Sequence, residues 1–65
     1  MSVDRSVYRT ERGTILRITE DDEGRLSVEL FDEPEWVAGP IGMAGLRLSP
    51  TTKRLTDRQI QSLPQ

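Results

Sequence analysis

Polar and apolar residues alternate most regularly between Gly13 and Phe31. Residues 25–30, Arg-Leu-Ser-Val-Glu-Leu, alternate strictly, and residues 14–19 are rich in β-branched side chains. A period of two is typical of a strand with one buried face. Residues 20–24, a polar cluster that ends in glycine, are typical of a hairpin loop. The pattern therefore predicts a β-hairpin.

Pairing the two strands of this hairpin predicts what each face carries. On one face, Arg17 and Glu29 are expected to pair across the strands. The other face is expected to carry five aliphatic side chains: Leu16, Ile18, Leu26, Val28 and Leu30.

A further strand is predicted upstream, over residues 7–10. Glu11-Arg12-Gly13 would join it to the hairpin, with the glycine at the positive φ that such turns often need. The result is a three-stranded antiparallel meander. A helix with Val3 and Val7 on one face is the competing interpretation.

The pattern changes between residues 32 and 50. Pro34 predicts the end of the second hairpin strand, because proline cannot donate to a strand ladder. Residues 36–45 contain three glycines and a proline and predict a glycine-rich loop. Residues 46–49 alternate again and predict a short fourth strand, closed by Pro50.

The C-terminal segment contains one helix signal. Thr56 with Gln59 three residues later resembles a capping box, and Asp57 suits the first turn. A short helix over about residues 57–63 would place Ile60 and Leu63 on one face. It is too short to be stable without packing.

These elements predict one small domain, residues 1–65, with an α+β fold that is mostly β. Its sheet is a three- or four-stranded antiparallel meander over about residues 6–49, either open or curled into a small open barrel. A short C-terminal helix completes it. A chain of 65 residues buries only about 60% of its unfolded surface, so either its small core is efficient or a partner completes it.

The composition argues against catalysis. The chain has no cysteine and no histidine, so it lacks the commonest metal ligand and the usual general base near neutral pH. The acidic run of residues 20–24 does not have the spacing of a calcium-binding loop. We therefore expect no enzyme activity, no metal and no cofactor.

Charge is distributed unevenly along a chain of net charge −2. Residues 20–35 carry eight acids against Arg25 alone, and the flanking segments are net basic. A solvated surface is the simplest interpretation. No apolar run is long enough for a signal peptide or a membrane span, so we expect a cytoplasmic protein that does not bind membranes.

Apolar residues that a small sheet covers only in part indicate a protein partner. Trp, Met and Arg often anchor protein interfaces, although the only tryptophan could equally fill the core. We expect a protein-interaction module or accessory subunit that docks through the glycine-rich loop and the C-terminal segment. The candidate partner-binding residues are Trp36, Val37, Ile41, Met43, Ile60 and Leu63.

Two other functions and one mode of assembly remain as alternatives. Small β-barrels bind nucleic acid through aromatic and basic residues on a sheet face, and the candidates here are Tyr8, Arg9, Arg12 and Arg17. Nucleic acid ranks behind protein as a partner. An acidic inhibitor or mimic would instead use residues 20–35, chiefly Asp21, Asp22, Asp32 and Glu33. Exposed strand edges at residues 7–10 or 46–49 could also pair two copies into a homodimer.

Overall fold

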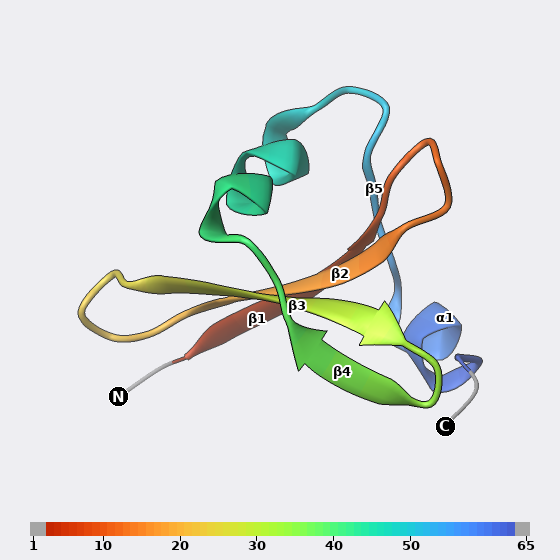
Figure 1. The fold of residues 1–65 in the computed structure, drawn as a ribbon, viewed down its shortest axis with the longest axis horizontal. Coiled ribbons are helices and arrows are strands. Elements are labelled where there is room, and N and C mark those ends of the chain that lie inside the picture. The colour runs from red at the N-terminus through yellow and green to blue at the C-terminus, as the bar shows by residue number, and fades with distance from the viewer. Residues whose placement is uncertain (1–2, 64–65) are drawn as a thin grey trace.

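A five-stranded antiparallel sheet forms the body of the protein (Figure 1). The computed structural model describes residues 3–63. The strands lie in the order β4-β3-β2-β1-β5. In chain order the elements are β1 (Asp4–Arg9), β2 (Ile15–Glu20), β3 (Leu26–Asp32), β4 (Glu35–Ala38), the 3₁₀-helix η1 (Ile41–Leu48), β5 (Lys53–Arg54) and α1 (Asp57–Gln61). The predicted α+β, mostly β fold is confirmed, as an open sheet with five strands rather than three or four.

The predicted meander is present with the expected register. Leu16 lies opposite Leu30 and Ile18 opposite Val28 in the β2–β3 hairpin. Strand β1 replaces the alternative N-terminal helix. The turns after β1 and β2 contain Gly13 and Gly24 at φ of 84° and 82°, a conformation that side chains other than glycine rarely adopt.

The main core lies on one face of the sheet, under η1. Leu16, Ile18 and Val28 are buried there together with Ala44 of η1, and Met43 packs against them. We call this side the η1 face. Leu16 is completely buried, so the predicted aliphatic stripe of the hairpin is the centre of the core.

The opposite side, which we call the α1 face, carries a second set of apolar side chains. Val7 lies opposite Arg17 and is therefore on the face that Leu16 does not share. The Leu55 N–H donates to the Val7 carbonyl at 2.8 Å, and both side chains are buried. Leu63 lines a hollow with Ile15 and Phe31 of this face. Figure 1 shows η1 and α1 on opposite sides of the sheet.

The second hairpin strand ends before Pro34 as predicted, since β3 stops at Asp32, but the prediction of a loop from residue 36 onward is wrong. Glu33 and Pro34 form a two-residue turn with a cis peptide bond between them, and β4 follows at once and pairs with β3. A turn residue does not need to donate to the ladder, so the proline fits here. Trp36 is consequently a strand residue opposite Phe31 and not part of a loop.

The fourth strand predicted at residues 46–49 is also wrong, because η1 occupies residues 41–48. Leu46 is half-buried, but Leu48 is 81% exposed, so the alternation of these leucines does not reflect a strand face. A 3₁₀-helix has three residues per turn. The glycine spacing of three at Gly42 and Gly45 matches that period.

The C-terminal helix begins as predicted. The Thr56 hydroxyl accepts a hydrogen bond from the Gln59 N–H at 3.2 Å, and the Gln59 side chain accepts one from the Thr56 N–H at 2.8 Å. This reciprocal capping box fixes the start of α1. The helix itself is shorter than predicted, ending at Gln61.

Candidate functional site

The outer edge of β4 carries backbone groups that the sheet leaves free. Directly after β4, the Gly39 N–H donates to the Val28 carbonyl at 2.9 Å. Bonded and non-bonded pairs alternate in an antiparallel ladder, so Val37 forms the next bonded pair, with Leu30. The N–H and C=O groups of Trp36 and Ala38 therefore point away from β3. No strand among residues 3–63 lies beyond them.

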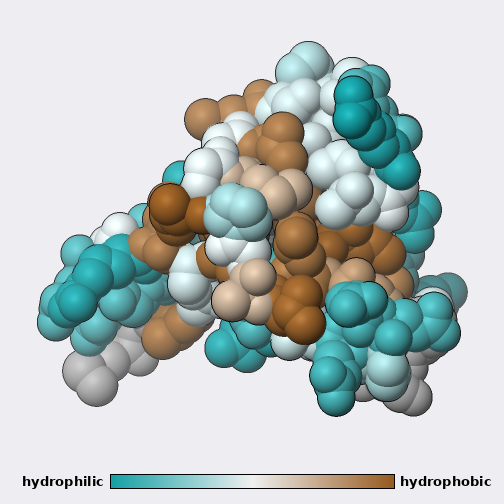
Figure 2. All heavy atoms as spheres, in the orientation of Figure 1, coloured by the Kyte–Doolittle hydropathy of each residue, from teal (hydrophilic) through white to brown (hydrophobic). Residues whose placement is uncertain are grey.

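Exposed apolar side chains accompany this edge. Val37 is 39% exposed and Ile41, at the start of η1, is 59% exposed. Figure 2 shows hydrophobic atoms gathered across the middle of the molecule, and hydrophilic atoms at the left-hand end, where the β2–β3 loop lies. Strand β4, Glu35-Trp36-Val37-Ala38, carries no cation. The edge therefore combines free backbone groups with an apolar surface.

Trp36 is held in place by its neighbours on the α1 face. The Arg17 guanidinium carbon lies 4.4 Å from the centre of the Trp36 ring. The Phe31 and Trp36 ring centres are 5.1 Å apart at an interplanar angle of 53°, within the tilted geometry that aromatic pairs favour. Arg17 in turn donates through Nε to Glu29 Oε1 at 2.9 Å. These contacts connect β4 to β3, its neighbour in the sheet, and to β2, the next strand.

The predicted ion pair between Arg17 and Glu29 is present. Arg17 Nη2 lies 2.8 Å from Glu29 Oε1, and both side chains are partly buried. The pair and the stacked tryptophan form one unit that runs across β2, β3 and β4. A cation stacked on an aromatic face contributes about 0.5–1 kcal/mol at an exposed site.

The six candidate partner-binding residues fall on two sides of the sheet. Val37 lies opposite Leu30 on the η1 face, which Met43 also packs against. Trp36 lies opposite Phe31 on the α1 face, and Leu63 lines a hollow with Phe31 on that side. Ile41 is exposed on η1, and Ile60 is half-buried on α1. The edge of β4 is where the two subsets come closest.

The four candidate nucleic-acid-binding residues do not share one surface. Tyr8 packs against the core of the η1 face. Arg17 is engaged by Glu29 and Trp36 on the other face. Arg9 and Arg12 are exposed, but no aromatic residue lines the hollows that they border.

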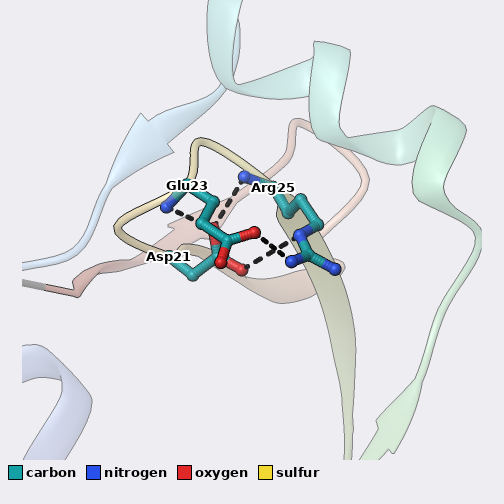
Figure 3. A network of polar contacts seen from close by, with 3 residues as sticks. All are labelled: Asp21, Glu23 and Arg25. Atoms are coloured by element: carbon teal, nitrogen blue, oxygen red, sulfur yellow. Dashed lines mark hydrogen bonds and ion pairs between the residues drawn. The ribbon is translucent and has the colours of Figure 1, made fainter.

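The acidic candidates occupy the two ends of β3. Asp21 and Asp22 lie in the loop before it, and Asp32 and Glu33 lie at its far end, about 20 Å away at the usual rise per residue. Figure 3 shows that Asp21 organises its loop. Its Oδ1 accepts from the Arg25 N–H at 2.8 Å, and Arg25 also pairs with Glu23. These acids therefore form two separate turns and no continuous face.

Sequence reasoning missed the second edge of the sheet. Lys53 lies opposite Arg9 and Arg54 opposite Tyr8 in the short β5 ladder. Leu55 N–H donates inward to Val7, so the same alternation turns only the backbone groups of Arg54 outward. A strand of two residues has no periodicity, so the basic character of this segment was the only signal in the sequence.

The remaining chemistry of residues 3–63 is limited. They contain no group of three or more carboxylates placed to hold a metal ion. Neither helix within this range has the length or hydropathy of a membrane-spanning segment. The chain matches no protein-family model, no curated protein and no solved structure at a significant level.

Proposed function

We propose that this chain is a small, non-catalytic protein-interaction module that binds an extended segment of a partner protein along the edge of β4. The observation that carries the proposal is the outward backbone of Trp36 and Ala38. An added strand would bond to those groups, as in other cases of strand addition to a sheet edge. The exposed side chains of Val37 and Ile41 would supply apolar contacts beside it.

The rigid cluster behind the edge supports the same role. Arg17 and Phe31 hold Trp36 in one position, so little side-chain freedom is lost when a partner arrives. Preorganisation of this kind raises affinity by lowering the entropy lost on binding. The pairing with β3 likewise holds β4 extended before it binds.

Ala38→Pro tests the proposal at one backbone group. Proline removes the outward N–H of residue 38, whereas the bonds between β4 and β3 do not use it. Peptides selected from a displayed random library against the full chain are expected to slow hydrogen exchange at the Trp36 and Ala38 amides. Their affinity should fall at least tenfold in Ala38→Pro. Ala38→Ser, which keeps the N–H, is the matched control and should bind as the parent does.

The same variants identify the source of the segment. Sedimentation equilibrium over a range of concentrations reports whether a second copy pairs with the edge, and Ala38→Pro should then remove that association. Peptides that bind Ala38→Pro as tightly as the parent would contradict strand addition at β4. Amide dispersion in NMR spectra confirms that each variant is folded.

A further inference from the structure

Two cationic side chains, Arg9 and Lys53, lie on the α1 face beside a hollow of about 350 Å³ at the β5 side of the sheet. Arg54 also lines the hollow, but its pairing with Tyr8 places its side chain toward the η1 face, and Glu11 is the one carboxylate among the lining residues. None of the three cations takes part in an ion pair among residues 3–63. The hollow therefore has an excess of positive charge in a chain whose net charge is −2.

Two of these cations face each other across a strand pair. Arg9 of β1 lies directly opposite Lys53 of β5. Like charges in this position destabilise a sheet. Protection of an exposed edge explains a cation on β5, but Arg9 lies on the inner strand of the pair. An anion between them would offset the repulsion.

The neutral polar side chains around the hollow have hydrogen-bond donors that an anion could accept from. The Gln59 Oε1 is occupied by the Thr56 N–H at 2.8 Å, which leaves its amide nitrogen as a donor. The Thr10 Oγ1 accepts from the Thr14 N–H at 3.2 Å, so its hydroxyl hydrogen is available. Arginine, amide and hydroxyl donors together are the set that binds an oxyanion.

We propose that this hollow binds the phosphate group of a compact phosphorylated ligand. Arg9 and Lys53 lie together at one hollow and do not form a stripe along which a polynucleotide could lie. Tyr8, the aromatic residue paired with Arg54, packs against the core and does not offer a free ring to a base. The proposal is independent of the role of β4.

Pyrophosphate titration followed by amide NMR of the full chain at low ionic strength tests this site. We expect saturable shifts at residues 9, 10, 51, 53 and 54. Lys53→Gln should weaken binding about two- to fivefold, the upper part of the range for one exposed ion pair. Glu11→Gln should strengthen it, because it removes the one negative charge on the rim. Arg47→Gln is the matched control, since Arg47 is an exposed cation that does not line the hollow.

Two results would overturn the proposal. The first is a set of shifts that sodium chloride reproduces at equal ionic strength, or that Arg47→Gln weakens as much as Lys53→Gln. The second is single-stranded oligonucleotide binding that is stronger than pyrophosphate binding and increases with length, which would identify a polynucleotide surface instead. Shifts confined to the hollow and reduced in Lys53→Gln alone would support it.

Discussion

The sheet has one edge at β4 and another at β5, and they present opposite chemistry. At the β4 edge the backbone N–H and C=O groups of Trp36 and Ala38 point outward, and the strand carries no cation. The β5 strand is two residues long and consists of Lys53 and Arg54. Short length and charge are the features by which natural sheets prevent edge-to-edge pairing. By this criterion β5 is protected and β4 is not.

The two edges are also anchored differently. Next to β5, Leu55 is only 6% exposed and bonds to the Val7 carbonyl, so a buried side chain holds the strand in place. Trp36 holds β4 through stacking on Arg17 and Phe31 while remaining half-buried. The difference indicates that β5 completes the fold, whereas β4 is fixed by its contacts on one side and keeps its outer edge exposed.

Leu55→Ala should produce the largest effect and would loosen the protected edge. Removing a buried leucine costs about 2–5 kcal/mol, a large part of the roughly 5–15 kcal/mol of a typical domain. Urea denaturation measures the change. Ile41→Ala, at an exposed position, is the control and should stay within about 0.5 kcal/mol of the parent. Equal losses in the two variants would show that Leu55 does not anchor β5.

Trp36→Leu and Arg17→Met should produce an intermediate effect at the open edge. Each is expected to lower the free energy of unfolding by about 1 kcal/mol, because each removes the stacked cation–aromatic contact. In a double-mutant cycle, the loss of stability in the double variant should be smaller than the sum of the two single losses by about 0.5–1 kcal/mol. Strictly additive losses would mean that Arg17 does not support Trp36.

Lys53→Glu should produce the smallest effect, and in the opposite direction. It converts the Arg9–Lys53 pair into an attractive one, which should raise the free energy of unfolding by about 0.2–1 kcal/mol. The gain should shrink at high salt because the pair is exposed. Arg47→Glu serves as the control and should give no comparable gain. A loss of stability in Lys53→Glu would show that repulsion between Arg9 and Lys53 is negligible.

The meander could be predicted because its signals are local. Strict alternation over residues 25–30 defined the faces of β3, and the glycine in each turn defined where the chain reverses. These two features together predicted the register of β2 and β3, and the register predicted that Arg17 pairs with Glu29. The capping box at Thr56 is local in the same sense.

The site could not be predicted as well, because it depends on pairing between distant segments. Pro34 was interpreted as a strand end, and the Trp36 segment was consequently assigned to a loop. Residues 46–49 alternate in sequence, but their conformation follows the three-residue period of η1. Strand β5 exists only because β1 offers an edge to it.

Strand β5 can be regarded as a tethered ligand of the β1–β4 meander. The first four strands are consecutive and pair with their neighbours, whereas Arg54 reaches back to Tyr8. A short flexible tether supplies its attached ligand at an effective concentration in the millimolar range, and here η1, which packs on the core, restricts the connecting segment further. A separate peptide spanning residues 53–63 would therefore need at least about that concentration to displace the chain's own segment from β1. The C-terminal segment therefore occupies the edge of β1 that a separate strand would otherwise bind.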